Sequence, residues 1–121
     1  MPDPTGPFRR VDRLLKSSEY GRVGREGRRV ADPAFVLLVS ERASDGAPQR
    51  IGITVSRKVG PAVVRNRVKR RVREWFRGAR SKLRGGIDVV VIWRSAAAAL
   101  SGRDTRGILC RLARKANATQ P

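Results

Sequence analysis

The residues best suited to chemistry in this sequence are basic, and they gather in one segment. Lys and Arg dominate the stretch from Arg57 to Arg84, in which Glu74 is the only acid. Like charges at this density repel one another unless a negative partner lies across them. Guanidinium groups can form two parallel hydrogen bonds to a phosphate, and Lys adds flexible point charge. The segment therefore predicts binding to a phosphate-rich polyanion.

The composition of the whole chain agrees with this prediction. Its 121 residues include 28 Lys and Arg against 10 Asp and Glu, which gives a formal net charge of +18. Solubility alone rarely needs a magnitude above about 8 in a small domain. A hydrophobic fraction of 40% separates the chain from disordered basic tails, which are too poor in apolar residues to build a core. A folded domain that binds nucleic acid is the leading class.

The inventory of reactive side chains is short. The chain has no His and a single Cys, Cys110, which excludes disulfide frameworks, Cys/His zinc sites and acid–base chemistry by His. If the protein takes part in catalysis, we expect the reacting groups to belong to its partner. Cys110 lies among Ile108, Leu109 and Leu112, and we expect it to be a small buried hydrophobe.

A helix from about Ala62 to Arg77 would position the basic side chains. Gly60 and Pro61 suit the entry to a helix. At about 100° per residue, one sector collects the apolar residues Val64, Val68, Val72 and Trp75, with Phe76 at its edge. The opposite sector collects Asn66, Lys69, Arg70, Arg73 and Arg77, while Arg65 and Arg67 flank the boundary. A face that is only solvated would mix charge signs, so we favour nucleic-acid binding. Asn66 can fix its neighbours, contact a sugar, phosphate or base edge, or be an ordinary polar position on the helix.

The remaining elements predict an α+β fold, a sandwich of helices packed on a small sheet. Residues 1–9 read as a loose tail and residues 10–117 as one domain. We expect a first helix from about Arg10, which a series of glycines ends near Tyr20 or continues only as a short, irregular turn. We expect a closing amphipathic helix over 104–116. Strands are expected at 35–40, 51–55 and 87–93. The first two are expected to form an antiparallel hairpin, and the third to be buried on both faces.

A resemblance sharpens this prediction. The stretch from Gly52 to Gly60, GITVSRKVG, followed by AVVRNRVKRRVRE from Ala62, closely resembles the signature of bacterial ribonuclease P protein subunits. The Arg-Asn-Arg triplet of that family matches residues 65–67. The resemblance implies a two-layer α–β sandwich, with a small mostly antiparallel sheet and a left-handed β-α-β crossover, against the usual hand. It also implies a ribonucleoprotein endonuclease that removes the 5′ leader from precursor tRNA.

The resemblance further implies roles for single residues, with no catalytic residue and no metal ligand in the protein. The partners implied are a catalytic RNA subunit, which would hold the magnesium ions, and the leader of precursor tRNA. Residues matching the RNA-facing motif are Arg57, Lys58, Arg65, Asn66, Arg67, Lys69, Arg70 and Arg73. Residues matching the leader cleft are Tyr20, Val23, Val36 and Leu38.

The leader cleft departs from the family pattern at two positions. Gly24 replaces a common second aromatic, and Leu38 falls where an aromatic often occurs. The ring of Tyr20 is retained, and base stacking on such a ring contributes about 1–3 kcal/mol. We therefore expect weaker stacking, with more reliance on Arg22 and Arg25. The alternative for Tyr20 is plain core packing.

Two other functions could use the same basic residues. A ribosomal or RNA-assembly protein without an enzymatic role could use the same basic helix to stabilise folded RNA. A DNA-binding helix would need residues spaced for base edges, and this dense basic face fits phosphates better. For this reason we do not expect DNA binding. No segment resembles a membrane-surface helix, a membrane span or a secretion signal, so we expect no membrane binding and a cytoplasmic location.

Overall fold

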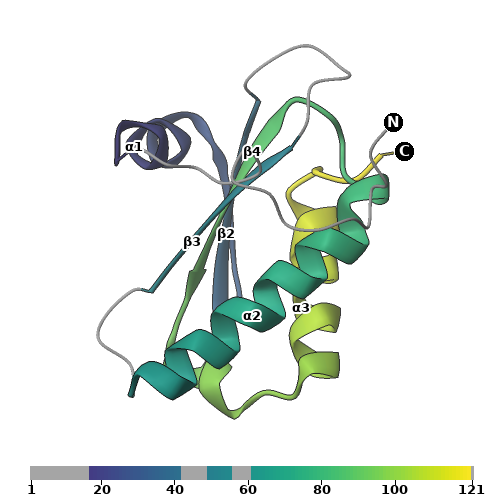
Figure 1. The fold of residues 1–121 in the computed structure, drawn as a ribbon. Coiled ribbons are helices and arrows are strands. Elements are labelled where there is room, and N and C mark those ends of the chain that lie inside the picture. The colour runs from purple at the N-terminus through teal and green to yellow at the C-terminus, as the bar shows by residue number, and fades with distance from the viewer. Residues whose placement is uncertain (1–16, 42–48, 56–60, 121) are drawn as a thin grey trace.

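A four-stranded sheet organises the chain (Figure 1). The computed structural model describes residues 17–41, 49–55 and 61–120. The strands are β1 (Arg28–Ala31), β2 (Phe35–Glu41), β3 (Arg50–Val55) and β4 (Ile87–Trp93), in the order β1-β2-β4-β3. The pairs β1–β2 and β2–β4 are antiparallel, and β3–β4 is parallel.

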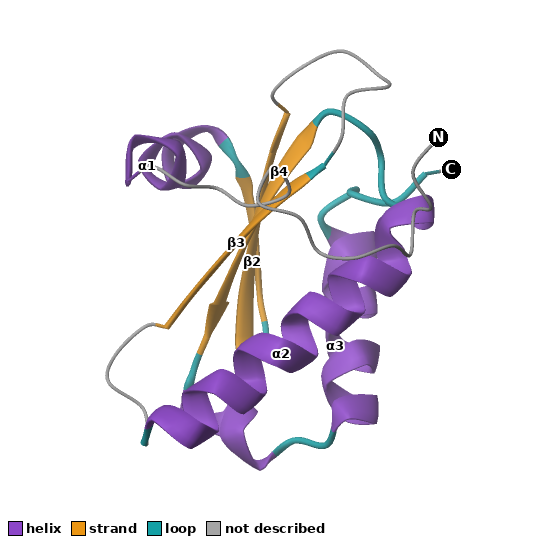
Figure 2. Ribbon diagram, viewed as in Figure 1, coloured by secondary structure: helices purple, strands orange, loops and turns teal. Residues whose placement is uncertain are grey.

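Helices cover the two faces of this sheet unequally. The long helices α2 (Ala62–Ala79) and α3 (Gly102–Lys115) lie on one face, and the short helix α1 (Ser17–Glu26) lies on the other (Figure 2). Two 3₁₀ turns, η2 (Arg80–Lys82) and η3 (Ser95–Ala99), connect these elements. The α+β class is therefore confirmed. No helix in the described part of the chain is both long enough and apolar enough to cross a membrane.

The alternating side chains of the strands divide the core in two. The larger part lies between the sheet and the helices α2 and α3, where α2 buries Val68, Val72, Trp75 and Phe76. The smaller part lies beneath α1, where Val23 packs on Val90 of β4. Because β4 is central and buried on both faces, its uninterrupted apolar run fits this position. The prediction for residues 87–93 is confirmed.

The predicted hairpin between residues 35–40 and 51–55 is wrong. The two strands are neighbours in the sequence, but β4 lies between them in the sheet and pairs with both. The chain leaves β3, crosses the sheet through α2 and returns as β4 in parallel, so the β-α-β crossover is present. Its left-handed sense stays a prediction. Burial of the most apolar strand at the centre outweighs pairing between sequence neighbours.

The first helix also differs from the prediction. Its expected start at Arg10 lies outside the described residues, and α1 continues beyond Tyr20 through Gly21 and Gly24 to Glu26. Packing of Val23 on the sheet compensates for the low helix propensity of these glycines. The chain then turns at Gly27, where a Cβ would lie 2.4 Å from the carbonyl oxygen of Val23. Strand β1 follows directly and was not predicted.

The predicted closing helix is confirmed with small shifts, but the predicted burial of Cys110 is not. Helix α3 begins at Gly102, after Ser101, whose side chain accepts a hydrogen bond from the backbone N–H of Asp104. Its buried stripe contains Leu109 and Leu112. Cys110 points away from this stripe and is exposed, so the expectation that it is buried is wrong. A helical residue next to a buried one points about 100° away from it.

Candidate nucleic-acid interface

The outer face of α2 presents the basic residues that the sequence predicted. Asn66, Arg70 and Arg77 are exposed, and Arg65, Lys69 and Arg73 are half-buried. The first turn of the helix contains no acid. The predicted sites Arg57 and Lys58 lie outside the described residues. The geometry thus offers a row of cations on a helix whose other face is fixed in the core.

Two arginines of α2 are bound within the protein instead. Arg67 donates from Nη2 to the carbonyl oxygen of Ala98 at 3.2 Å, and Arg71 donates from Nη1 to that of Leu100. These bonds attach the segment around η3 to the side of α2. Arg67 was predicted to face RNA, but its bond to Ala98 already uses part of its donor capacity. Arg71 was not predicted as a site residue, and nothing in the helical pattern distinguished it from its neighbours.

An open groove lies on the opposite face of the sheet, beside α1. It has a volume of about 400 Å³ and is lined by Tyr20, Leu38, Ile53, Thr54, Val90 and Ile92. Of the predicted cleft residues, Tyr20 and Leu38 line this groove. Val23 is fully buried behind it, and Val36 is buried at 4% exposure and does not line it. Sequence analysis missed the lining from β3 and β4, because the hairpin it expected put these strands in the wrong order.

The ring of Tyr20 lies close to the backbone of β3 at Gly52. A Cβ at Gly52 would approach ring atoms of Tyr20 to 2.6 Å, closer than any real contact, so only glycine leaves room for the ring. Burial raises the pKa of the Tyr20 hydroxyl, and a backbone hydrogen bond at Ile53 opposes this in part. The ring thus packs against the sheet at Gly52, while Tyr20 still lines the groove. This arrangement combines core packing with an accessible aromatic surface.

A buried acid fixes two arginines next to this groove. Asp88 is fully buried, and Arg50 donates to its two carboxylate oxygens at 2.9 Å each. Arg22 also pairs with Asp88 and donates to Ser40 Oγ at 3.1 Å. Hydrogen bonding to Asp88 raises the pKa of Arg50, with Glu19 contributing through an ion pair at 2.7 Å. Arg22, expected to serve the leader, therefore has partners in the protein, whereas Arg25 is exposed.

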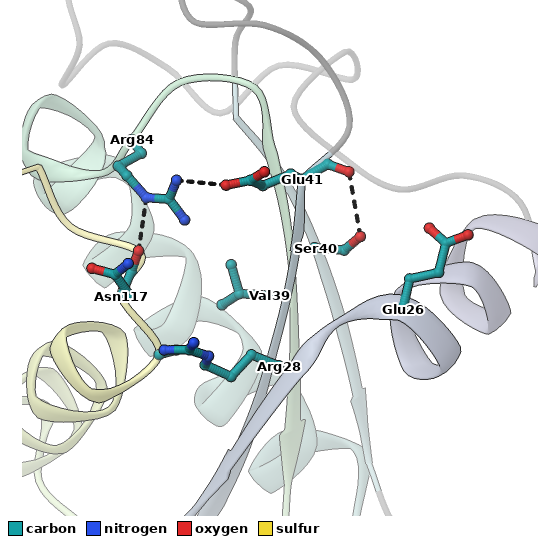
Figure 3. A pocket seen from close by; sticks show the side chains of 8 residues that line it. Glu26, Arg28, Val39, Ser40, Glu41, Arg84 and Asn117 are labelled. Atoms are coloured by element: carbon teal, nitrogen blue, oxygen red, sulfur yellow. Dashed lines mark hydrogen bonds and ion pairs between the residues drawn. The ribbon is translucent and has the colours of Figure 1, made fainter.

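Another pocket, of about 320 Å³, is lined by both acidic and basic residues (Figure 3). Arg84 donates from Nη1 to Glu41 at 2.8 Å and from Nε to the carbonyl oxygen of Asn117 at 2.7 Å. Glu26 and Arg28 also line it. Because its acids compete with any anion, this pocket is a poor phosphate site. Among the described residues, no group of three or more His, Cys, Asp or Glu side chains could hold a metal ion.

Comparison with known families and curated proteins agrees with the geometry. The family model described as Ribonuclease P matches residues 8–117. A ribonuclease P protein component from Gluconacetobacter diazotrophicus is 43% identical over 108 residues, covering 88% of this chain and 92% of the relative. One from Halalkalibacterium halodurans is 36% identical over 114 residues, covering 94% and 95%.

Solved structures extend the similarity to the fold. The RNase P protein of Staphylococcus aureus matches with a TM-score of 0.80 at 30% identity, covering 90% of this chain and 98% of the other. The RNase P protein of Thermotoga maritima matches with a TM-score of 0.75 at 32% identity, covering 85% and 96%. The similarity therefore extends over most of the chain and includes its fold.

Proposed function

The chain belongs to the ribonuclease P protein family, and from this membership we propose how it acts within that enzyme. Its function is that of the protein component of ribonuclease P, and this replaces the ribosomal or RNA-assembly alternative. We place the catalytic groups and the magnesium ions mainly in the RNA subunit. The protein then contributes binding and positioning in the removal of the 5′ leader from precursor tRNA.

In this proposal the outer face of α2 binds the catalytic RNA. The observation that carries it is the division of α2 into a buried apolar face and an outward row of cations that contains residues 65–67. Asn66 and Arg70 are exposed and available to RNA phosphates or sugars, and Arg65 lies beside them. Arg67 takes part through donors that its bond to Ala98 does not use.

The groove beside α1 would hold the single-stranded leader. Its walls are mainly apolar, and Tyr20 supplies an aromatic surface on which a base can stack. Sequence-tolerant binding fits such a surface, because every base has an aromatic face. Since α1 and α2 lie on opposite faces of the sheet, the protein would lie between the catalytic RNA and the leader (Figure 2).

A reconstitution experiment tests the proposal. The purified protein is mixed with a bacterial ribonuclease P RNA at low magnesium concentration, and cleavage of precursor tRNA is measured. We expect a higher cleavage rate with the protein than with RNA alone, because its cations reduce phosphate repulsion and its groove holds the leader. A Lys-rich peptide of equal charge is the control for screening alone. If the protein does no better than this peptide, the proposed function is wrong.

A further inference from the structure

A second cationic site lies at the end of α2 that is opposite to Arg65 and Asn66. There η2 and α3 both end, and residues 116–120 run beside them (Figure 1). A pocket of about 400 Å³ is lined by Ser81, Lys82, Arg114, Thr119 and Gln120. At a rise of 1.5 Å per residue, the 18 residues of α2 separate its two ends by roughly 27 Å.

Backbone hydrogen bonds fix the walls of this pocket. Gln120 donates from its backbone N–H to the carbonyl oxygen of Lys82 at 2.8 Å, and from Nε2 to that of Leu83 at 3.1 Å. The backbone N–H of Arg84 donates to the carbonyl oxygen of Ala118 at 2.7 Å. Leu83 and Thr119 also form an antiparallel bridge. The chain segments carrying the lining side chains are therefore held together by the fold.

Among the described residues, those that line the pocket are basic or polar, and none of them is acidic. Lys82 and Arg114 supply the two cationic side chains, and Ser81 and Thr119 are hydroxyl-bearing residues. Within the described ranges, no carboxylate lies within 4.0 Å of either cation. The pocket of Figure 3 differs, because its Arg84 is already paired with Glu41.

We propose that this pocket binds a phosphate group of the RNA backbone. Lys supplies point charge, Arg supplies two-point hydrogen bonding, and the hydroxyl groups complete a set of donors suited to phosphate oxygens. The site rests on the proposed function, because its phosphate belongs to the RNA that α2 holds. Between Asn66 and the pocket, Arg70 and Arg77 are exposed on the same side of α2. An RNA following this side meets cations along the whole helix and is fixed at its far end.

Two double variants test the site by separating the contribution of its charges from that of its hydroxyl groups. Lys82→Ala with Arg114→Ala removes both cations, whereas Ser81→Ala with Thr119→Val removes both hydroxyl groups at unchanged charge. Affinity for a ribonuclease P RNA is measured across a salt series with the full chain. We expect the first variant to bind about tenfold more weakly and to flatten the slope of log K against log salt by about 0.9 for each lost phosphate contact. We expect the second to lose severalfold in affinity without a change in net charge.

The control removes two exposed charges elsewhere, through Arg28→Ala with Arg29→Ala on β1. If the Lys82 and Arg114 variant loses no more affinity than this control, the proposal is overturned. A second arm titrates inorganic phosphate and adenosine monophosphate into the protein and follows the amide NMR signals of Ser81 and Thr119. Saturation by either small ligand, combined with unchanged RNA affinity in the variants, assigns the pocket to a free phosphate compound and overturns the RNA assignment.

The two arms also separate this proposal from the proposed function. If the unchanged protein does not bind ribonuclease P RNA, the proposed function fails. The phosphate arm then decides the pocket alone: signals that respond and saturate assign it to a free phosphate compound and overturn the RNA assignment, and silent signals overturn the phosphate site itself.

Discussion

Tyr20 is the residue at which packing and function meet most closely. It is the only tyrosine of the chain, so its ionisation can be followed by ultraviolet absorbance without interference from another phenol. Because burial raises the pKa of Tyr20, we expect its titration midpoint to lie above the value of about 10 that free tyrosine has. Tyr20→Phe should abolish the signal. A midpoint at or below that of free tyrosine would contradict the packing of the ring on β3.

The raised pKa of Tyr20 also predicts how the free energy of unfolding changes with pH. The folded-state pKa of Tyr20 exceeds that of the unfolded chain, so folding favours the neutral hydroxyl. Its contribution to the free energy of unfolding is fully present below the unfolded pKa of about 10 and is lost as the pH rises through the folded pKa. The loss should be absent in Tyr20→Phe, which urea unfolding at several alkaline pH values can measure.

Gly52 makes the position of this ring possible. A Cβ there would lie 2.6 Å from the ring of Tyr20, so Gly52→Ala must displace either the ring or β3. We expect a loss of about 1–3 kcal/mol in the free energy of unfolding, together with weaker preference for precursor over mature tRNA. Gly78→Ala in α2 is the matched control, since a Cβ there meets nothing within 4 Å and should stabilise the helix by about 0.5–1 kcal/mol. Equal effects of the two changes on unfolding would refute the contact.

At the scale of elements, α2 divides neighbouring arginines between structure and binding. Arg71 donates to the carbonyl oxygen of Leu100, whereas Arg70 is exposed on the outer face. Arg71→Ala should lower the free energy of unfolding by about 1.5–3 kcal/mol, because it removes a hydrogen bond from a charged donor. Arg70→Ala should change stability by less than about 0.5 kcal/mol and weaken RNA binding instead. Urea unfolding and RNA titration of both variants check this division, and a reversed pattern would contradict it.

The elements also show where sequence reasoning succeeds. The apolar sector of α2 and the run from Val89 to Ile92 follow from hydrophobic periodicity alone, because burial imposes a helical period or continuous apolar character on the chain. The outward cations of α2 then follow as the other half of the same pattern. For this reason the basic face, including Asn66 and Arg70, was predicted in the right place.

The failures have a common physical cause. Strand pairing depends on contacts between distant parts of the chain, and no local pattern shows that β4 lies between β2 and β3. Because the predicted hairpin was wrong, the groove walls that β3 and β4 form were not predicted. Strand β1 lacks a continuous apolar run because it is an exposed edge carrying Arg28 and Arg29. The bonds of Arg67 and Arg71 to the η3 segment depend on where α2 passes that segment, which helical periodicity does not encode.

At the scale of the whole molecule, the sheet separates two proposed RNA surfaces. The larger core supports α2 and the smaller core supports the groove at Tyr20, and the two lie on opposite faces of the sheet (Figure 1). Strand β4 contributes to both, because it is buried on each face. Because close packing holds this strand on each face, we expect each surface to keep its geometry when the other binds. The two surfaces should therefore contribute independently to recognition of precursor tRNA.

A double-mutant cycle tests this independence. Arg65→Ala with Arg70→Ala changes the α2 face, and Tyr20→Ala changes the groove. Arg67 is left in place because its bond to Ala98 would mix loss of structure with loss of binding. The α2 variant should weaken binding to the catalytic RNA and flatten the salt slope by about 0.9 for each lost phosphate contact. Tyr20→Ala should leave that slope unchanged and weaken precursor binding more than mature tRNA binding, by up to about 1–3 kcal/mol.

In the combined variant the two losses in precursor binding should add to within about 0.5 kcal/mol, because the changed residues share no contacts and lie on opposite faces of the sheet. A thermal unfolding curve of each variant controls for damage to the core, and Tyr20→Phe supplies a variant that keeps the ring. Coupling well above 0.5 kcal/mol, with folding intact, would mean that one RNA surface changes the other through β4. Equal losses of precursor and mature tRNA binding in Tyr20→Ala would instead assign Tyr20 to the core alone and move the leader site away from the groove.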